Sequence, residues 1–112
     1  MNKAEEAEKA TLGCVLVDPS VFCLVQEELK PEDFYSEQNR RVFIAMQTID
    51  KQNQQIDIAS LATILINDKS FMDGVINYMM DLESIVVSAN ALPMYMEIIR
   101  NESKRRQSLT LL

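Results

Sequence analysis

Residues 70–85, SFMDGVINYMMDLESI, carry the pattern that decides the expected fold. At a helical period they place two apolar rows side by side. The first row contains Phe71, Val75, Tyr78, Leu82 and Ile85, and the second contains Met72, Ile76, Met79 and Met80. A helix that is apolar over so wide an arc must bury more than one side. In a domain this small, we expect the second side to pack against another copy of the chain.

A final helix is expected after a short connection at residues 86–88. Asn90 can cap this helix, and Pro93 falls within its first turn, where the missing N–H costs little. Together with residues 70–85 it predicts an antiparallel helical hairpin over residues 70–108. The expected self-association seam consists of Met72, Ile76, Met79, Met80, Leu92, Met96 and Ile99. A charge at Ile76 or Met79 should then lower the oligomer mass without unfolding the chain.

The residues before this hairpin predict a small bundle over about residues 1–69. A first helix spans residues 3–17, and Asp18 with Pro19 ends it and starts a short second one. Residues 31–34 predict one helical turn. Ser36 and Asp57 are expected to cap two further helices. The fold class is therefore all-α, a small helical bundle followed by a C-terminal antiparallel hairpin, within one domain of residues 1–112.

Composition agrees with this fold class and limits the function. Only 2 glycines and 3 prolines occur in 112 residues, whereas strands and tight hairpins usually need more turn residues. The net charge of −6 argues against a surface that grips phosphates throughout. Neither a membrane-length apolar run nor a signal peptide is visible, so we expect a cytoplasmic protein. Cys14 and Cys23 are expected to be reduced and buried.

The sequence offers little for catalysis. Histidine is absent, and neither Gly13 nor Gly74 opens a phosphate-binding loop. Paired carboxylates are better explained as helix-terminal and solvated acids. We therefore expect no catalytic, cofactor-binding or metal-binding residue and no enzyme activity in this chain. Its end, leucines after a polar stretch without a cap, suggests a fragment of a longer protein.

One basic cluster remains near the C-terminus. It consists of Arg100, Lys104, Arg105 and Arg106. These cations can complement the dipole at the end of the last helix as a solvated face, or they can contact phosphate. The sequence leaves both interpretations open.

An ordered series of motifs resembles the N-terminal domain of the DnaB helicase family across nearly the whole chain. The N-terminal part of the series is Ala7-Glu8, Leu12-Gly13, Leu16, Asp18-Pro19, Leu29, Pro31-Glu32-Asp33-Phe34-Tyr35, Arg40 and Phe43. The remainder is Ile56-Asp57, Leu61, Leu65, Gly74, Tyr78, Leu82, Ser88-Ala89-Asn90, Tyr95, Ile98-Ile99, Glu102 and Arg105-Arg106. Three positions depart from the pattern: Asn39 replaces a usual His, Val75 a Gly and Gln55 a Pro. The departures suggest a divergent member, such as a phage-encoded one.

The resemblance implies a non-catalytic collar domain of a hexameric, ATP-dependent replicative helicase. In that family, hairpins pair into dimers and three dimers form the collar, while ATP and Mg²⁺ bind in a separate motor domain that this chain lacks. The collar receives primase and often a helicase loader, and DNA is bound only through the whole helicase. The positions that respond to primase correspond to Glu6 and Tyr78 here.

The sequence leaves other functions open. The helicase-interacting domain of a primase resembles the same fold. A small helical nucleic-acid-binding domain could use the basic end helix. A standalone helicase regulator that mimics the collar is a third alternative, and an enzyme is disfavoured by the missing histidine and phosphate loop.

Overall fold

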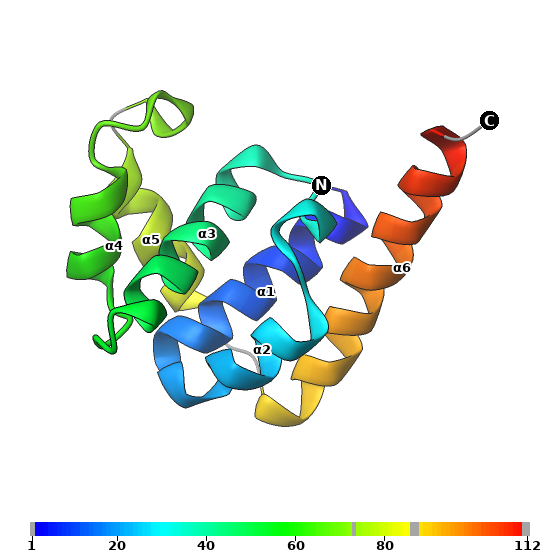
Figure 1. The fold of residues 1–112 in the computed structure, drawn as a ribbon, viewed down its shortest axis with the longest axis horizontal. Coiled ribbons are helices and arrows are strands. Elements are labelled where there is room, and N and C mark those ends of the chain that lie inside the picture. The colour runs from blue at the N-terminus through cyan, green and yellow to red at the C-terminus, as the bar shows by residue number, and fades with distance from the viewer. Residues whose placement is uncertain (1, 73, 86–87, 111–112) are drawn as a thin grey trace.

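Helix α1 (Lys3–Val17) is the element against which three of the other helices pack (Figure 1). The computed structural model describes residues 2–72, 74–85 and 88–110. In it, α1 contacts α3 (Glu37–Lys51), α5 (Val75–Ser84) and α6 (Leu92–Thr110). The Asn2 side chain caps this helix by accepting a hydrogen bond from the Ala4 N–H. Positions 4, 7, 10 and 13 of α1 are alanine or glycine. Because these side chains are small, neighbouring helices can approach the α1 backbone closely.

The other elements are helical throughout the described residues, which contain no strand. In chain order they are η1 (Pro19–Val21), α2 (Phe22–Glu28), η2 (Pro31–Asp33), α3 (Glu37–Lys51), α4 (Ile58–Leu65), η3 (Lys69–Phe71), α5 (Val75–Ser84), η4 (Ala89–Ala91) and α6 (Leu92–Thr110), where η denotes a 3-10 helix. The predicted all-α class is confirmed.

The last two helices do not pack along each other as the expected hairpin would. Helix α1 lies between them, with α5 on one side and α6 on the other (Figure 1). Their buried stripes share a core with α1, because Val75, Met79, Leu82, Leu92 and Ile99 are all enclosed in the single chain. The small residues of α1 let both helices pack closely against it, so each apolar stripe is buried mainly against α1.

Three phenylalanines hold α2, η2 and α3 together. The ring centroids of Phe34 and Phe43 are 4.8 Å apart, and those of Phe22 and Phe43 are 5.7 Å apart. All three are essentially inaccessible to solvent. Aromatic pairs at such distances add specific geometry to the burial of a large apolar surface.

Most predicted caps are confirmed. The side chains of Ser36 and Asp57 accept hydrogen bonds from the backbone N–H groups of Asn39 and Ser60, and Asp18 caps η1. Asn90 lies inside the 3-10 turn η4, and α6 begins only at Leu92, so Asn90 is not at the N-cap position predicted for it; its N–H donates to the Ser88 hydroxyl, 3.1 Å away.

The start of α5 also differs from the prediction. The helix expected from Ser70 begins only at Val75. Residue Met72 has a left-handed backbone (φ 47°), which interrupts the helical path before Gly74. The residues before α5 form the separate turn η3 instead.

The cysteines are free, as expected for Cys14 and Cys23. Cys14 is buried, whereas Cys23 is exposed, so the prediction of burial is wrong for Cys23. The buried face of α2 is formed by Phe22 and Val25 instead.

Candidate functional site

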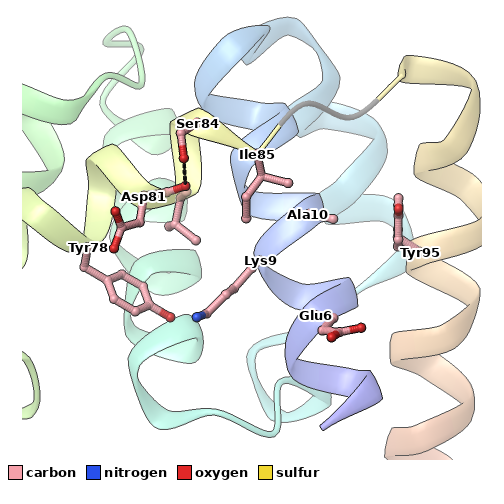
Figure 2. Close-up of a pocket in the computed structure, with 9 residues that line it drawn as sticks. Glu6, Lys9, Ala10, Tyr78, Asp81, Ser84, Ile85 and Tyr95 are labelled. Atoms are coloured by element: carbon pink, nitrogen blue, oxygen red, sulfur yellow. Dashed lines mark hydrogen bonds between the residues drawn. The ribbon is translucent and has the colours of Figure 1, made fainter. Parts of the chain in front are cut away.

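A groove of about 460 Å³ lies beside α1, between residues of α5 and α6 (Figure 2). Helix α1 supplies its floor, α5 and the residue that follows it supply one wall, and α6 supplies Tyr95 on the other side. The lining residues are Glu6, Lys9, Ala10, Tyr78, Asp81, Leu82, Ser84, Ile85 and Tyr95. Glu6 and Tyr78, which the resemblance singled out from distant parts of the sequence, therefore line the same groove.

The spacing of residues on α1 explains the floor. Glu6, Lys9 and Ala10 are three and four residues apart, so they lie on one face of the helix. Ala10 has a small side chain that leaves the floor low. One turn later, Gly13 lets the backbone of Leu82 approach α1 closely, since a Cβ at Gly13 would lie 2.3 Å from the Leu82 carbonyl oxygen.

A buried polar network supports Tyr78 from the protein side. The Tyr78 hydroxyl donates to Asn39 Oδ1, and Asn39 Nδ2 donates to Glu8 Oε1 at 2.9 Å. Glu8 also accepts hydrogen bonds from the backbone N–H groups of Tyr35 and Ser36. The network thus joins α1, α3, α5 and the loop before α3, and it orients the tyrosine ring that lines the groove.

Burial shifts the pKa values of the two acidic groups in this network. Desolvation raises the pKa of Glu8 above 4.5, although its hydrogen bonds and the charge of Arg106 act in the opposite direction. Desolvation, with a smaller contribution from the negative charge of Glu8, raises the pKa of Tyr78 to about 12. Tyr78 is therefore a neutral phenol at physiological pH.

Two further contacts hold the Tyr78 ring. The edge of the ring meets Phe71 with centroids 5.4 Å apart, and the Lys9 ammonium lies 5.6 Å from the ring centroid. Figure 2 shows the Lys9 amine turned toward Tyr78. A cation over a tyrosine face is attracted by the ring quadrupole, so Lys9 is directed to the tyrosine.

Sequence reasoning did not assign Asn39 to the site. Its only signal was that Asn39 stands where a His is usual in the family it resembles. In this chain the amide supplies one donor and one acceptor, which is what the carboxylate on one side and the phenol on the other require. A buried polar residue inside a predicted helix cannot be matched with its partners from sequence alone, because they lie 31 and 39 residues away.

The predicted self-association seam is wrong for four of its seven residues. Met79, Leu92, Met96 and Ile99 are buried in their own chain, so they cannot form a surface seam, and a charge at Met79 would disrupt the core rather than spare the fold. The other three remain exposed: Met72 by 87%, Ile76 by 50% and Met80 by 55%. The second apolar row is therefore split between core and surface.

An additional exposed residue extends this surface. Ile66, at the end of α4, is 54% exposed and borders two shallow pockets, one shared with Ile76 and the other with Met72. We call Ile66, Met72, Ile76 and Met80 the α5 apolar surface.

The basic cluster is largely engaged with the chain itself. Arg100 pairs with Glu28, and Arg105 pairs with Glu102 at 3.0 Å. Arg106 donates to the Asp33 carbonyl at 2.9 Å, and its guanidinium lies 5.3 Å from the Tyr35 ring centroid. Lys104 lines a mixed-charge groove with Glu28 and other residues. The arrangement favours the solvated, self-paired interpretation over phosphate binding.

The described residues contain no group of three or more Cys, Asp or Glu side chains placed to hold a metal ion. None of the helices in the described part of the chain combines the length and apolarity needed to span a membrane.

Comparisons with known proteins agree with this fold. Residues 1–101 match the family model described as the DnaB-like helicase N terminal domain. The chain is 29% identical over 103 residues to the replicative DNA helicase DnaC of Bacillus subtilis (strain 168), covering 91% of this chain and 23% of that protein. It is 33% identical over 106 residues to the replicative DNA helicase DnaB of Treponema pallidum (strain Nichols), covering 93% and 24%. The chain thus spans about a quarter of the length of these curated relatives.

A solved structure shares the fold. The crystal structure of the N-terminal domain of DnaB helicase from Mycobacterium tuberculosis superposes with a TM-score of 0.81 at 24% identity, covering 93% of this chain and 76% of that one. Since the family model covers most of the sequence, the chain belongs to the DnaB-like helicase N-terminal domain family.

Proposed function

We propose that this chain is a non-catalytic assembly and docking domain of a replicative DNA helicase acting in the cytoplasm. The observation that carries the proposal is the family match over residues 1–101, together with relatives named as replicative DNA helicases that are about four times as long. ATP and Mg²⁺ would bind in the rest of such a protein. This domain would hold subunits together and receive a primase or a helicase loader.

The α5 apolar surface supports the assembly role. Exposed apolar side chains scattered singly are normal, but Ile66, Met72, Ile76 and Met80 gather on α5 and the segment before it. Burial of this surface against a second copy would contribute about 25 cal/mol per Å² of apolar area, before the cost of association. Ile76 and Met80 are one helical turn apart, so one partner surface can cover both.

Light scattering on the purified chain tests the assembly role. Ile76→Glu should lower the average mass toward that of a monomer while the circular dichroism spectrum stays helical, because Ile76 is half exposed in the single chain. Leu24→Glu on α2 is the matched control, since Leu24 is 41% exposed but lies outside the α5 apolar surface. Equal mass for the wild type and Ile76→Glu would contradict assembly through this surface.

The groove supports the docking role. It is concave, it is lined by both Glu6 and Tyr78, and its tyrosine is held in place by the buried Asn39 and Glu8. A rigid surface binds with a smaller entropic cost than one that must be ordered on binding.

Binding of the chain to the primase and to the loader of its source organism tests this role. Biolayer interferometry should show binding of the wild type to one of them, weakened at least fivefold by Tyr78→Ala or Glu6→Ala. Glu27→Ala, an exposed acid on α2 outside the groove, should bind like the wild type. No binding of the wild type to either protein would overturn the docking role.

A further inference from the structure

We infer that the groove beside α1 accepts a partner's amphipathic helix that inserts an aliphatic side chain and carries basic side chains next to it. The inference rests on the proposed docking function and names the chemistry of the docked segment. Three features of the groove carry it: its shape, its apolar lining and the charge of its rim.

The shape fits a helix better than an extended strand. The floor is one face of α1, and α5 and Tyr95 of α6 stand on either side (Figure 2). No β-strand occurs in the described residues, so no sheet edge is offered there for strand addition. A channel between helices is the surface into which an amphipathic helix can lay its apolar face.

The apolar lining of the groove favours an aliphatic side chain on the partner helix. Ala10 and Leu82, which are almost fully buried, form the apolar base of the groove, and the partly exposed Ile85 and Tyr95 lie beside them. Figure 2 shows the Ile85 side chain turned toward α1. An aliphatic side chain that enters here would lose its contact with water against this carbon surface.

The negative charge at the rim of the groove favours basic side chains on the partner helix, next to the aliphatic one. Glu6 on α1 and Asp81 on α5 are both exposed, and among the described residues neither carboxylate has a hydrogen bond or an ion pair. Two other acids of the chain, by contrast, are engaged: Glu28 pairs with Arg100, and Glu8 is buried in the network with Asn39.

The cation among the described lining residues, Lys9, forms no ion pair with Glu6 or Asp81. Lys9 directs its ammonium over the Tyr78 ring at 5.6 Å. The net charge of the chain is −6, so the long-range field also attracts a basic partner and repels an acidic one. A phosphate-rich ligand would meet two carboxylates here, which argues against nucleic acid at this groove.

Two synthetic 16-residue amphipathic helices of identical leucine pattern provide the probes. One carries arginines beside the leucine row and the other carries glutamates at the same positions. Fluorescence anisotropy with the purified chain should give a Kd at least tenfold lower for the arginine peptide, and this preference should shrink as salt is raised from 50 to 300 mM, because exposed charges are screened.

Variants locate the binding. Glu6→Gln combined with Asp81→Asn should weaken the arginine peptide at least fivefold, whereas Glu27→Gln combined with Glu32→Gln removes the same charge elsewhere and should leave its Kd unchanged. Ser84→Trp, which fills the groove from an exposed position, should weaken it as well; Gln54→Trp in the loop after α3 is its control. Equal affinity for the two peptides, no binding of either at 1 mM, or insensitivity to the Glu6 and Asp81 changes would overturn the inference.

The outcomes also separate this inference from the proposed function. If primase or loader binds the wild type and the Glu6→Gln, Asp81→Asn double variant equally well, the inferred chemistry is wrong while the docking role stands. If neither protein binds the wild type, the docking role itself fails, whatever the peptides do.

Discussion

Gly13 is the residue at which the packing leaves least room for change. A Cβ there would lie 2.3 Å from the carbonyl oxygen of Leu82 and 3.2 Å from its carbonyl carbon. That carbonyl also accepts the Ile85 N–H, so it belongs to the end of α5 and cannot turn aside as a flexible side chain would. Gly13 does not have a positive φ, so backbone conformation is not the reason for glycine at this position. Glycine is required because the backbones of α1 and α5 meet there.

Gly13→Ala should therefore push α5 away from α1 and destabilise the chain. Overpacking of this kind costs about 1–3 kcal/mol, and contact with backbone places the expectation at the upper end. Urea unfolding followed by circular dichroism measures the change. Gly74→Ala is the control, because its Cβ would meet only the Phe71 carbonyl oxygen at 3.1 Å and should cost less. Equal stability of Gly13→Ala and the wild type would mean that the helices are not held this closely.

Tyr78 should make the free energy of unfolding depend on pH in the alkaline range. Burial raises its pKa from 10.0 to about 12, so the folded chain favours the neutral phenol. The stability that follows from this preference is fully present below pH 10 and is lost as the pH rises toward 12. Because the ring is partly exposed, the loss should be smaller than the shift alone implies.

Comparison with Tyr78→Phe isolates this contribution. Between pH 10 and 12, the wild type should lose unfolding free energy more steeply than the variant. In the folded wild type, part of the tyrosinate absorbance at 295 nm should develop only near pH 12, and this part should be missing from Tyr78→Phe. If the two proteins show parallel pH profiles, the phenol is not buried in the way described.

The turn η2 forms hydrogen bonds that hold the second half of α6 against the bundle. The Asp33 side chain accepts hydrogen bonds from the Ser103 hydroxyl and from the Lys30 N–H, each at 2.8 Å, and the Asp33 carbonyl accepts one from Arg106. Ser103 is buried, so its hydroxyl depends on this partner. The η2 turn, which precedes α3, thus also attaches the polar end of α6 to the bundle.

Asp33→Ala should loosen that attachment. Removing the acceptor leaves the buried Ser103 hydroxyl without this partner, at a cost of about 1–3 kcal/mol. Hydrogen exchange should accelerate at the amides of residues 103–109, while those of residues 95–99, the turn that carries the buried Met96 and Ile99, keep their protection. Uniform acceleration along the whole helix would show instead that α6 detaches as a unit.

The elements also show what sequence could and could not predict. The bounds of α1 and the starts of α3 and α4 follow from local signals, because Ser36 and Asp57 cap groups only a few residues away. The packing partners of α5 and α6 do not follow from local signals. An apolar stripe shows that a face is buried, but α1, which covers that face, lies far earlier in the sequence. For the same reason, the role of Asn39 cannot be predicted from local signals. Glu6 and Tyr78 are predicted as site residues only through the resemblance of motifs.

For the whole molecule, the position of α1 between α5 and α6 makes the fold one cooperative unit. The buried cluster that includes Leu12, Phe43 and Leu61 also includes Met79 and Ile99. A bundle of residues 1–69 with an appended hairpin would instead keep its core without the last helices. The ten buried residues along α1 lie on several sides, which no set of partners from residues 1–69 alone covers in this structure.

A chain cut after residue 69 should therefore fail to fold. It would lose seven core side chains, namely Phe71, Val75, Met79, Leu82, Leu92, Met96 and Ile99, and it would expose the faces of α1 that α5 and α6 cover. Small domains have stability margins of only about 5–15 kcal/mol, and single large-to-small core changes already cost about 2–5 kcal/mol, so the loss exceeds the margin. Thermal melting followed at 222 nm should show a cooperative transition for residues 1–112 and a sloping, non-cooperative signal for residues 1–69. A sharp transition in the shorter chain would show that α5 and α6 cover a bundle that is already complete, and α1 would then not be the centre of the fold.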